Sequence, residues 1–305
     1  MNEKLMLPIA IPSAAVLVSA GVVLYAGARW KRQTARFRER MLTCRRCPGV
    51  DRFDPADIEA LPAPVKRYLN TVLSPGQPLV TAAWFSQDGT FRLRRNTKNP
   101  WVHLTATQAV TTVPSAFDWR ARMMLAPGLS IFVQDSYFRG VGELHATVRG
   151  LVPVMQAADT PQLNSSELVR FLAEAPWYPT VLLPGHGITW EPLTDSSARA
   201  VLTDCGLRVA VEFHFDESGL VNRTSVPSRF RMTDDGGTQA PWQGRFWDYR
   251  EVSGMRVPTK GEVAWVLPDG PQPYWRATVT PERYEYCGQS SPTQPVPSRS
   301  VEAVY

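Results

Sequence analysis

Alternation of apolar and polar residues with a period of two dominates the chain after residue 60. In Arg208–Phe215, valine and phenylalanine fill one set of alternate positions, and arginine, alanine, glutamate and histidine fill the other. Such alternation predicts β-strands with one covered face and one solvated face. Further extended runs lie at Trp101–Val113, Leu220–Val226, Phe246–Glu251, Arg256–Trp265 and Tyr274–Val279. The pattern therefore predicts an antiparallel meander.

Short turn sequences separate the predicted strands. Asp88-Gly89 lies between two alternating runs, Val80–Gln87 and Thr90–Arg95, and predicts a tight hairpin. Glu217-Ser218-Gly219 and Ser253-Gly254 predict two further turns, because glycine and serine favour the backbone conformations that tight turns require.

Two segments have helical rather than strand periodicity. Ala63–Leu73 spaces its apolar residues three and four apart and carries a proline in its first turn, where proline is tolerated. Asn164–Ala175 begins with Asn164 and Glu167 in a capping-box-like spacing and ends before a proline. Because strands precede and follow this second helix, a division into two lobes near it stays open.

The N-terminal segment shows the sharpest contrast in polarity. Leu5–Ala28 is 24 residues without a charged side chain, and Arg29–Arg46 then carries eight Lys/Arg and one acid. A helix of that length spans about 36 Å, enough for the roughly 30 Å hydrocarbon core of a bilayer. The sequence therefore predicts an N-terminal transmembrane helix that anchors the chain, at residues 1–28. Two alternatives stay open: a signal peptide cleaved after Ala26-Gly27-Ala28, and a buried helix of a soluble fold.

The net charge is divided unevenly along the chain. Residues 1–50 carry nine Lys/Arg and two acids, a net +7, whereas residues 51–305 carry 24 Lys/Arg and 26 acids, a net −2. A nucleic-acid-binding domain carries its basic surface on the fold itself, so this distribution argues against nucleic acid as a partner. We predict a basic stem at residues 29–60, one β domain at 61–287 and a disordered Ser/Pro/Gln-rich tail at 288–305.

The basic flank also bears on orientation. Basic residues directly after a membrane span resist translocation, which favours a cytoplasmic domain over one outside the membrane. The sequence thus predicts a single-pass protein of the cell membrane, with a slight preference for the cytoplasmic side. The same residues suit contact with anionic lipids of the bilayer.

The four cysteines give no clear framework. Cys44 and Cys47 form a lone C-x-x-C, while Cys205 and Cys287 lie far along the chain. A structural zinc site needs four ligands, and no second pair of metal-ligand residues has suitable spacing. Incidental thiols are the expected interpretation, and a disulfide or redox pair or a metal ligand set remain alternatives.

Several stretches resemble an uncharacterised bacterial family known only as a domain of unknown function. They are Leu61–Leu69 (LPAPVKRYL), Phe171–Pro179 (FLAEAPWYP), Phe246–Glu251 (FWDYRE) and Gly254–Trp265 (GMRVPTKGEVAW). The resemblance covers about residues 60–286. It carries over no catalytic residues, because none is established for that family.

The order of elements also resembles that of LolA-like lipoprotein carriers: an N-terminal helix, a long meander, a mid-chain helix and a second meander. Phe246–Val257 adds an aromatic-Arg pair, a turn with glycine and an Arg-Val-Pro entry to the next strand. The resemblance implies a mainly β (α+β) fold, in which an antiparallel sheet curves into a half-barrel. It also implies about two helices over the mouth and a cavity for acyl chains. This chain departs from such carriers in its predicted anchor and basic stem.

Candidate chemistry is sparse. Glu174 lies at the end of the second predicted helix beside Trp177 and Tyr178, where a carboxylate would line a cavity mouth or act as a general acid. A solvated helix charge is the plainer interpretation. His186 lies between two glycines in an expected mobile turn and is the strongest histidine candidate. The chain contains no nucleophile elbow, P-loop or dinucleotide fingerprint.

An excess of large aromatic residues is the other feature of the folded region, since the chain has ten tryptophans. Aromatic residues on strands pack cores, but they also line ligand cavities, which are mostly apolar. The candidates for a cavity lining are Trp177, Tyr178, Trp247, Tyr249, Trp265 and Trp275.

Three functions follow as hypotheses. The first is a membrane-anchored binding module that holds a lipid, an acyl chain or another hydrophobic small molecule in an aromatic-lined β cavity. The second is an enzyme on a membrane-associated substrate, with Glu174 and His186 as acid and base. The third is a scaffold that presents a sheet edge to a partner. The lack of catalytic motifs favours binding over catalysis, and we expect no cofactor and no metal.

Overall fold

The computed structural model describes residues 7–49, 51–93, 101–232 and 237–288, with side chains from residue 21 onward. Of the predicted tail at 288–305, only Gly288 falls within this range.

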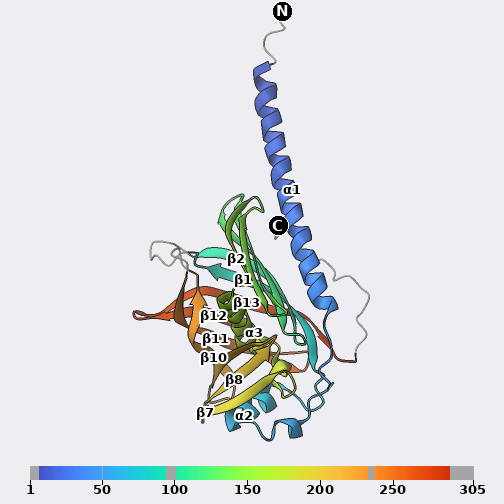
Figure 1. Cartoon of the computed structure of the whole chain (residues 1–305), viewed down its shortest axis with the longest axis vertical. Helices are drawn as coiled ribbons and strands as arrows, with labels where there is room; N and C mark the ends of the chain where they lie inside the picture. The colour runs from blue at the N-terminus through green and yellow to red at the C-terminus, as the bar shows by residue number, and fades with distance from the viewer. Residues whose placement is uncertain (1–6, 50, 94–100, 233–236, 289–305) are drawn as a thin grey trace, which may run out of the picture.

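One antiparallel sheet of 13 strands forms the body of the protein (Figure 1). The strands are β1 (Val80–Phe91), β2 (Val102–Thr111), β3 (Ala116–Ala126), β4 (Leu129–Phe138), β5 (Val141–Val148), β6 (Val152–Ala158), β7 (Ile188–Thr194), β8 (Ser197–Asp204), β9 (Leu207–Phe215), β10 (Val221–Arg231), β11 (Thr238–Val252), β12 (Met255–Leu267) and β13 (Gly270–Tyr286). Their spatial order is 6-5-4-3-2-1-13-12-11-10-9-8-7. The sheet is curved and open, with β6 and β7 at its edges. The mainly β, antiparallel class is therefore confirmed.

The pairing of β1 with β13 decides how the chain is divided. It joins the meander β1–β6 to the meander β7–β13 along their full edges. The strands before and after the mid-chain helix thus belong to a single sheet. A division into two lobes at that helix does not occur.

Three α-helices and three short 3-10 segments accompany the sheet. They are α1 (Leu7–Thr43), η1 (Pro55–Ile58), α2 (Ala63–Val72), α3 (Pro161–Ala173), η2 (Ala175–Trp177) and η3 (Pro179–Leu182). The helix predicted at Ala63–Leu73 is confirmed to within one residue as α2. The mid-chain helix is also confirmed, but it starts earlier than its sequence pattern suggested. Thr160 is the true N-cap, and its side chain accepts a hydrogen bond from the Leu163 amide.

One predicted turn is wrong. Asp88-Gly89 lies inside β1, which runs without interruption between β2 and β13. Gly89 pairs with Ala277, and a Cβ atom at this position would collide with the Arg276 carbonyl oxygen. The glycine therefore permits close approach of two strands rather than a reversal of the chain. The two other turns are confirmed, and in the second both Ser253 and Gly254 have positive φ.

The two faces of the sheet have different partners. The inner face carries the main hydrophobic core, with residues such as Phe117, Val133 and Phe213, and α3 packs across it on β4, β5, β9 and β10. The outer face meets α1, where Met41 and Phe138 join a smaller cluster of buried residues. Figure 1 shows α3 within the curve of the sheet and α1 along its outside.

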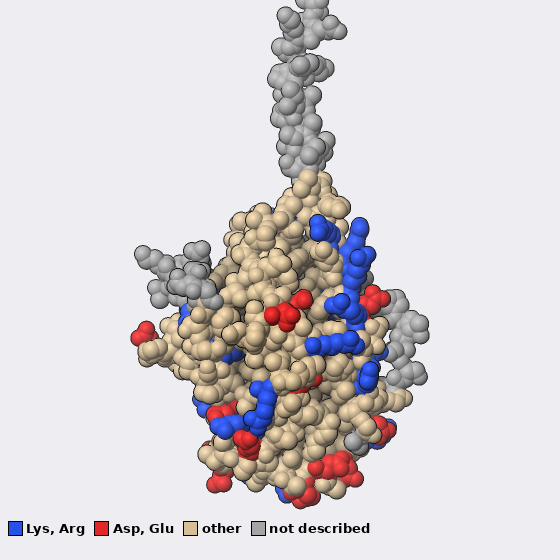
Figure 2. Space-filling view, viewed as in Figure 1, with Lys and Arg blue, Asp and Glu red and all other residues tan. Residues whose placement is uncertain are grey.

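The C-terminal half of α1 is fastened to the sheet by buried polar contacts. Arg38 Nε donates to the fully buried Asp118 at 2.6 Å, and Arg120 donates to the same carboxylate at 2.8 Å. Much of the predicted basic stem is thus helical and docked on β2 and β3. Lys and Arg side chains gather along this side of the molecule in Figure 2.

No helix in the described part of the chain is long and apolar enough to cross a membrane. The predicted span at Leu5–Ala28 falls largely on residues 1–20, whose side chains lie outside the described residues.

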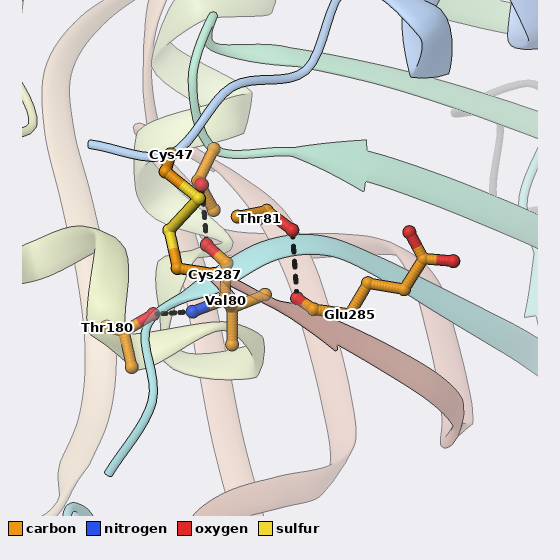
Figure 3. The surroundings of a disulfide bond; sticks show 7 residues. Cys47, Val80, Thr81, Thr180, Glu285 and Cys287 are labelled. Atoms are coloured by element: carbon orange, nitrogen blue, oxygen red, sulfur yellow. Dashed lines mark hydrogen bonds between the residues drawn. A yellow bond between two sulfur atoms is a disulfide. The ribbon is translucent and has the colours of Figure 1, made fainter. Parts of the chain in front are cut away.

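A disulfide closes the chain on itself. Cys47 is bonded to Cys287, with Cα atoms 5.4 Å apart, so the residues after α1 are tied to the end of β13 (Figure 3). The interpretation of these two cysteines as incidental thiols is therefore wrong, and Cys44 and Cys47 do not pair with each other. Cys44 and Cys205 are free. The partner of Cys47 lies 240 residues away, so local spacing could not reveal it.

Candidate functional site

A buried ionic network lies where α3 crosses the inner face. Arg170 donates from Nη1 to Asp135 on β4 at 2.5 Å and from Nε to Glu174 at 2.8 Å. Gln108 on β2 donates to the other oxygen of Glu174 at 2.6 Å. The Arg170 guanidinium also lies over the Trp119 ring, 5.0 Å from its centroid. One arginine thus links the helix to two strands.

Glu174 is a buried anchor rather than a solvated helix charge. Its exposed fraction is 8 %, and both carboxylate oxygens accept hydrogen bonds. The polar chain continues from Gln108 to Gln87 at 3.0 Å, and Gln87 in turn accepts from the Trp119 indole at 2.8 Å. Because a carboxylate at this depth needs full pairing, these contacts satisfy both of its oxygens and hold α3 in place.

A second carboxylate of α3 is less well satisfied. Glu167 lies 3.8 Å from Arg229, and its other oxygen, Oε2, has no hydrogen-bond partner among the described residues. Burial, with a further contribution from Asp135, raises the pKa of Glu167 well above its ordinary value of 4.5. The raised pKa of Glu167 favours the neutral form of this side chain.

Four of the six aromatic candidates pack together or against their neighbours in the core. Trp177 contacts Trp275 with ring centroids 6.2 Å apart and Phe246 at 5.7 Å. Tyr178 is fully buried, and its hydroxyl donates to the Phe171 carbonyl at 2.5 Å. Trp265 stacks on Tyr274. These residues are buried in the core on the inner face of the sheet, so a ligand at Trp177 would have to displace packed side chains.

The other two candidates, Trp247 and Tyr249, belong to a separate region. Both line an open cleft of about 820 Å³ on the far side of β11 from α3, together with Arg223, Arg245 and Arg256. Trp247 is 43 % exposed, while the Tyr249 hydroxyl donates to the Val221 carbonyl at 2.7 Å. The six aromatic residues therefore do not form one cavity.

His186 is not in a mobile, exposed turn. Its exposed fraction is 7 %, its Nδ1 lies 3.3 Å from the Leu183 carbonyl oxygen, and burial lowers its pKa. Among the described contacts, His186 and Glu174 share no hydrogen-bond or ion-pair partner. The described contacts therefore give no support to the acid/base pair of the enzyme hypothesis.

An uncovered part of the inner face was missed by sequence reasoning. Beyond α3, the ends of the hairpins β3–β4 and β5–β6 carry exposed apolar side chains on the same face as the core. Leu129, Val152 and Met155 are 41 %, 59 % and 37 % exposed. Leu129 lies two residues before the buried Ile131 on β4, so both side chains point to the same face. Ile131 pairs with Val148 on β5, and Val148 pairs with Val152 on β6, so these residues also share that face. We call Leu129, Val148, Val152 and Met155 the apolar hairpin patch.

A signal for this patch was present in the sequence. Leu151 to Met155 includes four apolar residues in five, more than a half-buried edge strand requires. The pairing register was needed to show that Val152 and Met155 of this segment extend the core face.

Comparisons with known proteins place the chain in a family. A model described as "Family of unknown function (DUF6920)" matches residues 59–284, and the chain belongs to this family. The comparison with curated proteins gives no match. The structure is similar to that of the LolA superfamily protein NE2245 from Nitrosomonas europaea, with 9 % identity, 72 % of this chain and 92 % of that chain covered, and a TM-score of 0.35. At that score the structural likeness carries no argument about function.

Proposed function

We propose that this DUF6920 protein is a membrane-anchored module that binds a lipid or another hydrophobic ligand. The observation that carries the proposal is the apolar hairpin patch, an exposed continuation of the hydrophobic inner face. Soluble surfaces rarely keep contiguous apolar side chains exposed without a binding role. The patch borders the buried Ile131 and Ala146, so an acyl chain on it would continue the core.

The position of α1 supports a membrane as the source of the ligand. The backbone of Gly150, at the turn of hairpin β5–β6, lies against Ala26 of α1. In Figure 1 the hairpins rise beside the helix towards its N-terminal half. On α1 itself, Leu24 and Tyr25 are 72 % and 68 % exposed. If Leu5–Ala28 enters a bilayer, the hairpin ends reach its surface.

The basic residues of α1 suit the same orientation. They begin at Arg29, directly after the predicted span, and would lie at the level of anionic lipid headgroups. Apolar hairpin ends and a basic belt at one level would hold the open part of the inner face against the bilayer. A ligand could then enter from the membrane without crossing water.

The disulfide bears on the side of the membrane. Disulfides persist in oxidising compartments and are rare in the cytoplasm. Although the basic flank favours a cytoplasmic domain, Cys47–Cys287 supports a domain on the outside, and we propose this orientation. An alkaline phosphatase fused after Tyr305, which is active only outside the cytoplasm, tests it. An inactive fusion of normal abundance would return the domain to the cytoplasm.

Photocrosslinking tests the binding function. The full chain is reconstituted in vesicles whose phospholipids carry a diazirine on the acyl chain, and labelled peptides are mapped by mass spectrometry. We expect labelling of β4–β6 on the apolar hairpin patch. Leu129→Asp should reduce it about tenfold, because burial of a leucine side chain contributes roughly 1.5–3 kcal/mol.

Met124→Asp is the matched control. Met124 lies on the same hairpin with 42 % exposure, but it pairs with His103 and Ser130 on the outer face. Its substitution should leave labelling of the patch unchanged. Equal loss in both variants would mean that the hairpins only dip into the bilayer, and absence of labelling in the wild type would contradict ligand binding altogether.

The scaffold alternative has one observation in its favour. β6 is an edge strand whose residues are almost all exposed, so its backbone can pair with another strand. Under this alternative, substitutions that block strand pairing along β6 would abolish binding of the partner, whereas Leu129→Asp would not.

A further inference from the structure

A second surface has chemistry opposite to that of the apolar hairpin patch. The cleft of about 820 Å³ around Trp247 is lined by three arginines, Arg223, Arg245 and Arg256, and by His214. We call it the arginine cleft. Its volume falls within the range of small-molecule sites. Binding in this cleft does not depend on hydrophobic-ligand binding at the hairpins.

The acids of the cleft are already engaged, whereas its arginines make no ion pair with a carboxylate of the described residues. Asp216 accepts hydrogen bonds from the amides of Ser218 and Leu220 at 2.9 and 3.0 Å, within the β9–β10 turn. Asp248 binds Arg250 at 3.0 Å and Lys260 at 3.5 Å.

Among the described residues, Arg223, Arg245 and Arg256 make no ion pair with a carboxylate. The cleft therefore holds three guanidiniums that make no direct ion pair in the described part of the chain, although Asp216 and Asp248 belong to the same lining.

The register places two of these charges directly opposite each other. Arg223 on β10 pairs with Arg245 on β11, so both side chains leave the same face of the sheet side by side. Like charges in this position destabilise a sheet. Glu262, on the other side of Arg245, is bonded to Arg276. An anion between Arg223 and Arg245 would remove this repulsion.

The histidine of the cleft is held neutral by its neighbours. Arg223 Nη2 lies 3.2 Å from His214 Nδ1, and a guanidinium only donates, so Nδ1 accepts. The proton is then on Nε2, which lies 2.9 Å from the Ser225 hydroxyl. Burial and the charge of Arg223 lower the pKa of His214. The imidazole thus orients Arg223 instead of adding a charge of its own.

Trp247 adds a flat apolar surface beside the positive charges. It is 43 % exposed, unlike the other tryptophans considered above, which are at least nine-tenths buried. An exposed indole next to guanidiniums suits a ligand that combines a ring with an anionic group. The three arginines alone would suit a bare anion.

The cleft lies away from the end of the protein where the hairpins meet α1. Gly219, in the β9–β10 turn beside the cleft, lies 3.5 Å from Thr71 of α2 when measured from an ideal Cβ position. In Figure 1, α2 is at the opposite end of the domain from the hairpins that accompany α1. A ligand in the cleft is therefore expected to come from the aqueous phase.

We infer that the arginine cleft binds a small soluble anion, in which a phosphate or carboxylate group lies between Arg223 and Arg245 and a ring stacks on Trp247. The chemistry of a phosphate is shared with lipid headgroups, and the experiment separates the two sources.

Calorimetric titration of the full chain in detergent tests the inference with three probes. They are adenosine monophosphate, which joins a phosphate to a ring, inorganic pyrophosphate, and citrate. We expect saturable binding of at least one probe that weakens as salt is raised. Arg223→Gln and Arg245→Gln should each weaken it at least tenfold, because each removes a charge-assisted hydrogen bond. Trp247→Leu should weaken adenosine monophosphate more than pyrophosphate.

Arg208→Gln is the control variant. Arg208 is on β9 and on the same face as His214, but it lies outside the cleft and 3.9 Å from Glu191. It should bind the probes as the wild type does. Equal weakening in this variant, or no saturable binding of any probe, would overturn the inference. Displacement of the bound probe by phosphatidylglycerol vesicles would overturn the assignment to a soluble ligand.

Discussion

The inner face of the sheet is one continuous surface with two differently treated parts. Where α3 lies, Gln108, Arg170 and Glu174 are paired with one another, and nearby aromatic residues such as Tyr178 are fully buried. Beyond α3, on the same strands, Leu129 and Val152 remain exposed. The first part is a packed core, and the second is an exposed apolar surface. The difference shows that α3 alone is too small to cover the whole inner face of a sheet this wide.

The length of a strand and the width of a helix explain why α3 covers only part of the inner face. β3 has 11 residues and therefore extends about 36 Å at roughly 3.3 Å per residue. A helix with its side chains is only about 10–12 Å across. Because α3 crosses the strands, it covers a fraction of their length. The remaining length either meets another element or stays open, and at the hairpin ends β3–β6 stay open on the inner side.

The largest expected effect is loss of the arginine that fastens α3. Arg170→Met leaves Asp135 and Glu174 buried without their cation, which typically costs about 3–5 kcal/mol in the free energy of unfolding. Urea unfolding of the full chain in detergent measures it. Arg199→Met is the control, since Arg199 pairs with Glu212 on an exposed part of the sheet. A loss no larger than in this control would mean that α3 is held by apolar packing alone.

A smaller effect is expected when the buried and the exposed parts of the inner face are compared on one strand, β4. Ile131 is 8 % exposed and Leu129, two residues away on the same face, is 41 % exposed. Ile131→Ala should lower the free energy of unfolding by about 2–4 kcal/mol, because it opens a cavity. Leu129→Ala should change it by no more than about 0.5 kcal/mol. Similar losses in the two variants, measured by the same urea titration, would show that the hairpin end is part of the core.

The fold was predictable where its signals are local. Alternation in Arg208–Phe215 and the helical spacing in Ala63–Leu73 depend on neighbouring residues, and both elements are found. Asp88-Gly89 misled because its local pattern is that of a hairpin. Position 89 requires glycine because the backbone of β13 approaches it closely, and the contacting residues of β13 lie almost 190 residues away in the chain.

The candidate sites were less predictable because their geometry is non-local. The burial of Glu174 depends on Arg170, four residues earlier on α3, and on Gln108 from β2, and no sequence spacing brings Gln108 to this pair. The arginine cleft depends on the register that sets Arg223 against Arg245. Residue type made Trp247 and Trp177 equal candidates for a cavity lining, but the sequence could not show that Trp247 lies exposed in a cleft whereas Trp177 is buried in the core.

The smallest effect concerns the protonation of Glu167, the unevenly satisfied carboxylate under α3. Its folded-state pKa is raised above the ordinary 4.5, mainly by burial. The stability it contributes is therefore fully present below about pH 4.5 and is lost as the pH rises towards the folded-state pKa. Glu167→Gln stays neutral, so the variant should gain on the wild type in unfolding free energy as the pH rises from 4 to 8. Glu143→Gln should behave oppositely: His145, whose Nε2 lies 3.7 Å from the Glu143 carboxylate, lowers the pKa of Glu143, so the contribution of Glu143 is lost as the pH falls below about 4.5. Urea titrations at several pH values give both differences, and parallel curves for wild type and Glu167→Gln would contradict a raised pKa under α3.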